Sequence, residues 1–199
     1  MNVGQMTEKV RLWTRLTSTN ANTDGIIREV LHTAYQDLVS EFATQFPDLF
    51  VEATDLTLTG VYTNLPSAVE LITRVELIST SAQVQNRPGR ELPQVDSRDR
   101  SAAPVTGYFL VDRTIGLTNL TATDRVLRIF YRPDVEEFVN SADIPRLIPH
   151  LHHMAIVWYA SFMLQGRDNA PTEFIVNQHR VTKSQLYAAM AHASNTMRL

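Results

Sequence analysis

The sequence predicts an α+β fold, with helices packed on a small antiparallel sheet or meander. Segments in both halves of the chain repeat apolar residues every three or four positions, which is the period of an amphipathic helix. Between them, short segments alternate apolar and polar residues and are bounded by glycine and proline, as in half-buried strands. The composition agrees with this, because 199 residues with 44% hydrophobic side chains can bury a core without metal or disulfide cross-links.

Two helices are predicted at the start of the chain. Residues 6–16 have the pattern of a short amphipathic helix anchored by Trp13. The polar residues 17–23 can cap a second, long helix, which begins near Asp24 and ends at Phe46, before a proline. Its apolar stripe consists of Ile27, Val30, Leu31, Ala34, Tyr35, Leu38, Val39 and Phe42.

The middle of the chain predicts strands. Residues 55–62 alternate as in a half-buried strand with a bend at Gly60, and residues 73–79 predict another strand. A short helical turn is expected between them, through Ala68 and Leu71. Three apolar runs then predict an antiparallel meander: residues 107–112, 114–117 and 125–131. In the last run alternate residues face opposite sides of the sheet, one of which should be covered by helices.

Two further helices are predicted at the carboxy-terminal end. A third helix should start near Ile144, and residues 150–165 carry apolar side chains around most of its circumference, so it should be largely buried. Gly166 is expected to end it. Pro171 then places a helix start before Phe174, and the final helix fades near residue 196.

Composition excludes several classes of function. With 18 basic and 21 acidic residues the net charge is −3, so a strongly basic nucleic-acid-binding domain is excluded. The absence of cysteine excludes thiolate catalysis and thiolate zinc sites. The sequence has no nucleotide-binding glycine loop and no nucleophile elbow. It also has no apolar run long enough to span a membrane and no export signal, so we expect neither membrane insertion nor export.

The strongest enzymatic alternative is a metal-dependent hydrolase that uses His150, His152 and His153. His150 and His153 are three residues apart and could share one face of a helix. Zinc normally takes a third protein ligand, and the glutamate of the protease motif is missing here. We therefore interpret the cluster as a polar helix start and expect no enzyme activity, no metal and no cofactor.

Residues 85–104 form a long segment with mixed charges. Its arginines could contact phosphates, which leaves a small nucleic-acid-associated module as a second alternative. Acidic residues are interspersed among them, so ion pairing with a neighbouring subunit is the favoured interpretation. The chain has 16 arginines and only two lysines, a bias that suits protein interfaces. The arginines predicted to lie at an interface are Arg87, Arg90, Arg98 and Arg100.

The order of these elements resembles that of the head-to-tail connector proteins of tailed bacteriophages, of the adaptor or tail-accessory-factor type. The resemblance spans roughly residues 24–165 and rests on landmarks that follow one another along the chain. They are the helix 24–46, the strand into Gly60-Val61-Tyr62-Thr63-Asn64-Leu65-Pro66, the strand 74–78, the proline- and arginine-containing loop, the meander, and Pro149-His150 before a helix with Tyr159-Ala160.

This resemblance implies a structural virion protein with no catalytic residues. It implies a ring, expected to be a dodecamer, that docks on the portal protein, contacts the next tail or neck protein and surrounds passing DNA. The expected location is the neck of the virion, after assembly in the host cytoplasm. We predict one connector domain, residues 1–199, with a body at about 20–165.

The two terminal segments are predicted to bind partners. They are the helix within residues 1–16 and the helix or arm 171–199, both outside the predicted body. Their predicted interface residues are Trp13, Phe174, Arg180 and Tyr187.

Overall fold

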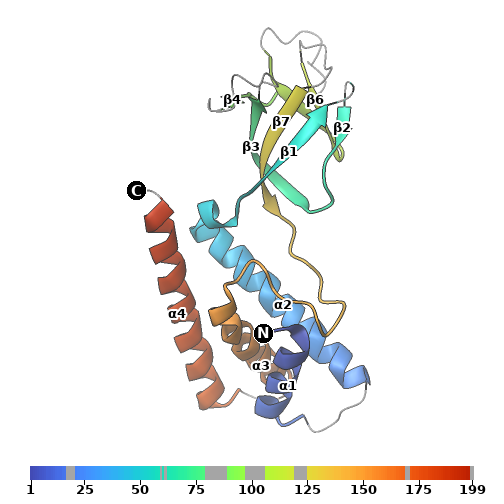
Figure 1. The fold of residues 1–199 in the computed structure, drawn as a ribbon. Coiled ribbons are helices and arrows are strands. Elements are labelled where there is room, and N and C mark those ends of the chain that lie inside the picture. Colours follow the sequence, from blue (N-terminus) through green and yellow to red (C-terminus); the bar gives the residue numbers. More distant parts are fainter. Residues whose placement is uncertain are drawn as a thin grey trace. The chain divides into compact units, whose positions relative to one another are not determined.

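The computed structural model describes residues 1–16, 21–58, 60, 62–78, 89–96, 106–118, 125–168 and 171–197. The chain forms two units, of which the first, Met1–Phe50 with Val135–Leu199, is helical and the second, Val51–Asp134, is built of strands (Figure 1). The predicted α+β class is therefore confirmed. The two are called the helical unit and the β unit below.

The helical unit contains four α-helices among its described residues. They are α1 (Val3–Thr14), α2 (Ala21–Gln45), α3 (His153–Asp168) and α4 (Glu173–Met197), with short 3-10 turns η1 (Pro47–Phe50) and η3 (His150–His152). The long second helix and the final helix lie close to their predicted bounds. The start of α1 and both ends of α3 differ from the predictions.

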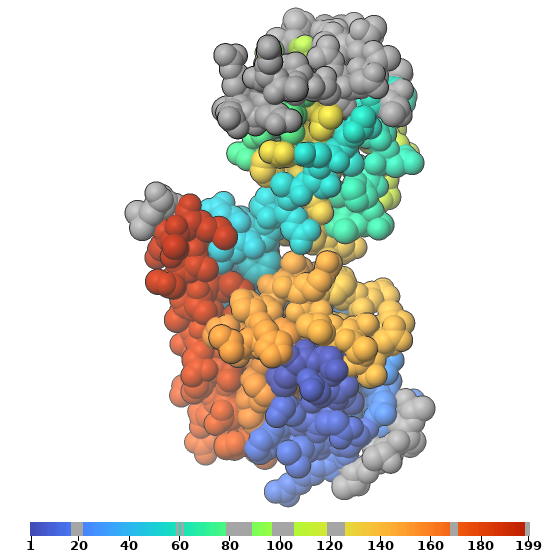
Figure 2. All heavy atoms as spheres, in the orientation of Figure 1, coloured from blue at the N-terminus to red at the C-terminus, as the bar shows by residue number. Residues whose placement is uncertain are grey.

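Helix α1 starts at Val3, three residues before the predicted start. Asn2 caps it, since the Asn2 side chain accepts a hydrogen bond from the Gln5 N–H (2.9 Å) and the Gln5 side chain accepts one from the Asn2 N–H (3.1 Å). The Val3 N–H also donates to the Asp143 carbonyl (2.8 Å), which places α1 beside residues 135–150 on the surface in Figure 2.

The predicted helix start near Ile144 is wrong. Residues 144–149 are not helical, and α3 begins only at His153. Pro145 and Pro149 explain this, because each lacks the backbone donor that a helix interior needs. The predicted end at Gly166 is also slightly early, since the helix continues to Asp168.

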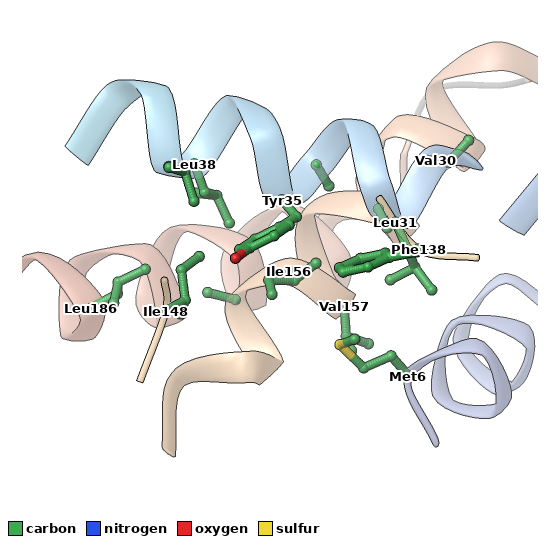
Figure 3. Close-up of a cluster of buried hydrophobic side chains, with 14 of the residues drawn as sticks. Met6, Val30, Leu31, Tyr35, Leu38, Phe138, Ile148, Ile156, Val157 and Leu186 are labelled. Atoms are coloured by element: carbon green, nitrogen blue, oxygen red, sulfur yellow. The ribbon is translucent and has the colours of Figure 1, made fainter. Parts of the chain in front are cut away.

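The core of the helical unit lies between α2 and α3 (Figure 3). The Tyr35 ring stacks on Phe138 with centroids 5.2 Å apart, and both side chains are buried. Helix α3 is largely buried, as predicted, and α4 packs on it. The buried apolar residues of α4 are Ile175, Leu186 and Met190.

The β unit has seven strands among its described residues, all paired antiparallel. They are β1 (Glu52–Leu58), β2 (Tyr62–Asn64), β3 (Val69–Ile78), β4 (Arg90–Glu91), β5 (Tyr108–Val111), β6 (Thr114–Leu117) and β7 (Arg125–Pro133). One sheet has the order β1-β7-β3-β4 and the other has the order β2-β6-β5.

Three predictions about this unit need correction. The predicted meander is a β5–β6 hairpin only, because β7 lies between β1 and β3 in the other sheet. The predicted bent strand 55–62 is two strands, one in each sheet. The predicted helical turn through Ala68 and Leu71 is wrong, since Ala68 lies in a turn and Leu71 lies in β3.

The side chains of β7 alternate between two faces, as predicted. Leu127, Ile129 and Tyr131 are buried, and Arg128 is exposed. The buried face packs against strands of the second sheet rather than against the helices that the sequence led us to expect. On the outer face Arg128 donates two hydrogen bonds to the Asp55 carboxylate, at 2.8 and 3.0 Å.

Candidate interaction surfaces on the helical unit

Three aromatic side chains meet where α1, α3 and α4 come together. Trp13 lies near the end of α1, Trp158 lies within α3, and Phe174 lies in the first turn of α4. The ring centroids of Trp13 are 4.9 Å from Trp158 and 5.6 Å from Phe174, and Trp158 and Phe174 are 5.7 Å apart. The structure thus brings together Trp13 and Phe174, two of the residues predicted from the sequence to bind partners.

Beside these rings the surface opens into a groove of about 1080 Å³, which we call the tryptophan groove. It lies where the ends of four helices meet: the carboxy ends of α1 and α3 and the amino ends of α2 and α4. Its apolar lining comes from Leu12, Trp13, Leu16, Ile26, Leu164, Phe174 and Ile175. The sequence alone did not predict this groove, because it requires the ends of four helices to meet.

Two arginines also line the tryptophan groove. Arg15 ends α1 in a left-handed backbone conformation (φ 58°), and Arg167 lies in the last turn of α3. Both side chains are exposed, and neither forms an ion pair with any residue that the structure describes. By contrast, Asp24 of α2 is paired with Arg11 of α1. The groove therefore combines an apolar lining with two unpaired positive charges.

A second, smaller depression of about 360 Å³ lies between α2 and α4, and we call it the α4 depression. Arg180 and Tyr187, both predicted interface residues, line it. The Tyr187 ring packs against Phe46 with centroids 5.2 Å apart. Lys183 lines it as well and pairs with Glu41 at 2.7 Å. The eight predicted residues thus include one pair in each of two separate hollows.

His179 is a further residue of the α4 depression that the sequence analysis did not single out. Its ring stacks on Tyr159 (4.8 Å between centroids) and on Phe162 (5.6 Å) of α3. Burial lowers the pKa of His179, and the nearby Lys183 ammonium adds to this effect. Tyr159 and Phe162 are three residues apart and therefore share one face of α3. This spacing was the signal in the sequence that could have indicated an aromatic neighbour.

The three clustered histidines occupy different environments. His150 is exposed and His152 is half-buried, whereas His153 is buried. The His153 Nδ1 lies 3.0 Å from the amino group of Met1, and its Nε2 lies 3.0 Å from the Ile148 carbonyl oxygen. Both ring nitrogens are therefore occupied by protein groups. Within the described ranges, no group of three or more histidine, aspartate or glutamate residues is arranged to hold a metal ion.

The predicted arginine surface is visible only in part. Arg90 is exposed in β4, where its partner across the sheet is Leu77. Arg87, Arg98 and Arg100 lie outside the described residues. Among the helices that the structure describes, none combines the length and apolar character needed to cross a membrane.

Comparison with known protein families gives a match over nearly the whole chain. The family model described as SU10 adaptor protein matches residues 1–198, which include both the helical unit and the β unit. No curated protein matches the chain.

Proposed function

Because the chain belongs to the SU10 adaptor protein family and is thus a phage adaptor structural protein, we propose that it docks on the portal and links the capsid vertex to the tail. The observation that carries this proposal is the extent of the family match, residues 1–198. A match confined to one unit would support only a shared module. A match over both units supports the same role for the whole chain.

The proposed assembly is a closed ring of identical subunits, a dodecamer, at the neck of the virion. Heterologous contacts between identical subunits close into a ring when the rotation between neighbours divides a full circle. The excess of arginine over lysine supports protein contacts, since guanidinium groups make planar, multi-donor hydrogen bonds. We place residues 85–104 at a subunit boundary or at the lumen, where DNA passes.

The two hollows of the helical unit are the proposed docking surfaces. The tryptophan groove offers exposed aromatic and aliphatic side chains, and the α4 depression offers Arg180 beside Tyr187. Aromatic and arginine side chains are enriched at the centres of protein interfaces. The proposed role is structural, and it assigns no residue to catalysis, to a metal or to a cofactor.

The direct test is reconstitution with the portal protein from the same phage. The purified chain is mixed with assembled portal, and the product is examined by electron microscopy and native mass spectrometry. We expect an added ring at the tail-facing end of the portal, with a mass increase equal to twelve subunits. A portal that stays unchanged at saturating concentrations of the chain, while the chain remains folded by circular dichroism, would contradict the proposal.

A further inference from the structure

The tryptophan groove gathers exposed apolar side chains from three helices. The exposed fractions are 69% for Leu12, 36% for Trp13, 39% for Ile26 and 50% for Phe174. These four side chains come from three helices and line the same groove. Isolated exposed apolar residues are common, but a contiguous group is typical of a binding site.

The position of the groove restricts what can enter it. It lies at the helix ends, so an occupant meets side chains of four helices at once, and the two rings of Trp13 and Phe174 form one wall. Trp158 supports this wall from inside, because it is only 5% exposed. A rigid aromatic wall backed by a buried ring suits large apolar side chains of a partner.

The charged residues at the groove favour a partner that carries negative charge. Arg15 and Arg167 are the charged residues in its described lining, and neither has an ion-pair partner among the described residues. Asp24 is paired with Arg11, and Glu173 lies in the first turn of α4 but is not part of the lining. The groove is therefore apolar within and positive at two points.

We infer that the tryptophan groove binds a segment of a partner protein whose large apolar side chains are flanked by carboxylates. The apolar side chains would cover Leu12, Ile26 and Phe174, and the carboxylates would pair with Arg15 and Arg167. A nucleic acid would use the two arginines but leave the apolar lining exposed to water. This inference rests on the proposed function in one respect, which is that the partner belongs to the head–tail assembly.

The protein carries its own reporter for this site. It has two tryptophans, Trp13 and Trp158, and they are in contact with each other at the groove. Occupation of the groove therefore changes the intrinsic tryptophan fluorescence. The probes are three short synthetic helical peptides without tryptophan. The first has leucine and phenylalanine on one face and glutamate on the other, the second has lysine in place of glutamate, and the third has alanine in place of the apolar residues.

We expect the glutamate peptide to change the emission saturably at about 0.15 M salt, with an affinity at least about tenfold higher than that of the lysine peptide. The alanine peptide should give no saturable change. Equal affinities for the glutamate and lysine peptides, or binding of the alanine peptide, would overturn the inference.

Variants locate the binding. Replacing both arginines, Arg15→Glu with Arg167→Glu, should reverse the preference toward the lysine peptide. Leu12→Ser should weaken binding of the glutamate peptide about tenfold without loss of structure, because Leu12 is 69% exposed. Lys9→Glu is the matched charge control, since Lys9 is exposed and outside the lining, and it should leave the affinity within about twofold.

Two results separate this inference from the proposed function. If the chain binds the portal but does not bind the glutamate peptide, the inference alone is overturned. Peptide binding without portal binding would contradict the proposed function alone. If sedimentation shows self-association that Leu12→Ser abolishes, the occupant is a second copy of the chain, and the assignment to a partner protein is overturned.

Discussion

The indole rings of Trp13 and Trp158 lie 4.9 Å apart between centroids, tilted by 41°. Trp158 is 5% exposed and belongs to the interior, whereas Trp13 is 36% exposed and faces the tryptophan groove. The same contact therefore attaches α1 to α3 and supports the wall of a proposed binding surface. A change at Trp13 should affect both stability and binding.

Trp13→Ala is expected to lower the free energy of unfolding of the helical unit by about 2 kcal/mol, less than for a fully buried tryptophan. The loss follows from the missing contacts with Trp158 and Phe174. Urea denaturation followed by circular dichroism measures it. Leu12→Ala is the control, since this 69% exposed neighbour should change stability by less than about 0.5 kcal/mol. Equal effects of both substitutions would show that the ring contacts are not stabilising.

The helices were predictable from the sequence because their evidence is local. The apolar stripe of α2 runs from Ile27 to Phe42, and Pro47 stands two residues after the end of the helix. The start of α1 was missed because it depends on hydrogen bonds between Asn2 and Gln5 rather than on an apolar pattern. The start of α3 was missed because apolar residues around Ile144 continue the pattern through two prolines.

Tyr35→Phe is expected to destabilise the helical unit by about 1–2 kcal/mol. The Tyr35 hydroxyl donates to the Glu136 carboxylate (3.0 Å) and accepts from the Leu147 N–H (3.1 Å), so it joins α2 to both ends of the segment that precedes α3. Burial raises the pKa of this phenol, which therefore stays protonated and able to donate. Thermal unfolding measures the effect.

Tyr159→Phe is the matched control for Tyr35. The Tyr159 hydroxyl donates to Asp37 at 3.2 Å in an exposed setting, so its removal should cost clearly less. A Tyr35→Phe protein as stable as the unaltered chain would show that water replaces the hydroxyl at no cost.

Stability of the helical unit is expected to fall as the pH drops below 6.5. Burial lowers the pKa of His153 from its ordinary value of 6.5, and the Met1 ammonium lowers it further. His153 therefore takes up a proton near pH 6.5 in the unfolded chain but only at lower pH in the folded chain. The free energy of unfolding is thus highest above pH 6.5 and falls as the pH drops toward the folded-state pKa of His153. The slope cannot exceed about 1.4 kcal/mol per pH unit for one histidine.

Urea denaturation between pH 8 and pH 5 measures this dependence. His153→Asn should reduce the slope but not abolish it, because burial also lowers the pKa of His179 and gives a change of the same sign. A slope unaltered by His153→Asn would assign the pH dependence to other groups.

The strands were predictable, but their partners were not. Alternation along β7 correctly predicted that its side chains divide between two faces, since that pattern is local. Its place between β1 and β3 depends on pairing with residues more than 40 positions away, such as Leu56 with Leu127. No local pattern specifies such a register, so the sequence suggested the neighbouring hairpin instead.

Gly107→Ala is expected to destabilise the β unit by about 2 kcal/mol. An added Cβ would lie 2.6 Å from the Pro93 carbonyl oxygen and 2.6 Å from a methyl carbon of Val95, which is closer than packed atoms allow. Because both tryptophans lie in the helical unit, hydrogen exchange of the β5 amides is the suitable measurement.

Gly25→Ala is the control for this substitution. Nothing lies within 4 Å of an added Cβ at Gly25, which is exposed in α2, so alanine should stabilise the helix by about 0.5–1 kcal/mol. Unchanged exchange rates in Gly107→Ala would mean that the Pro93 segment moves aside freely.

The candidate site was predictable only as single residues. Trp13 and Phe174 were identified as large apolar residues on the terminal helices, and both line the tryptophan groove. Arg15 and Arg167 were missed because their place in its lining depends on how the helix ends meet. The contacts of Trp158 with Trp13 and Phe174 were missed for the same reason. Composition can indicate an interface, but three-dimensional packing decides which side chains share it.

Arg180→Glu is expected to weaken association with the portal by about tenfold, if the α4 depression is a docking surface as proposed. Arg180 and Tyr187 line that depression, and both are exposed. Point substitutions are preferable to deletion of residues after Pro171, because Ile175, Leu186 and Met190 of α4 belong to the core. Tyr187→Ala should weaken association as well. Only the effect of Arg180→Glu should diminish in high salt, because screening acts on charges.

Lys9→Glu makes the same charge change on α1 and should leave portal affinity within about twofold. Equal losses in Arg180→Glu and Lys9→Glu would mean that overall charge, and not this surface, governs the association.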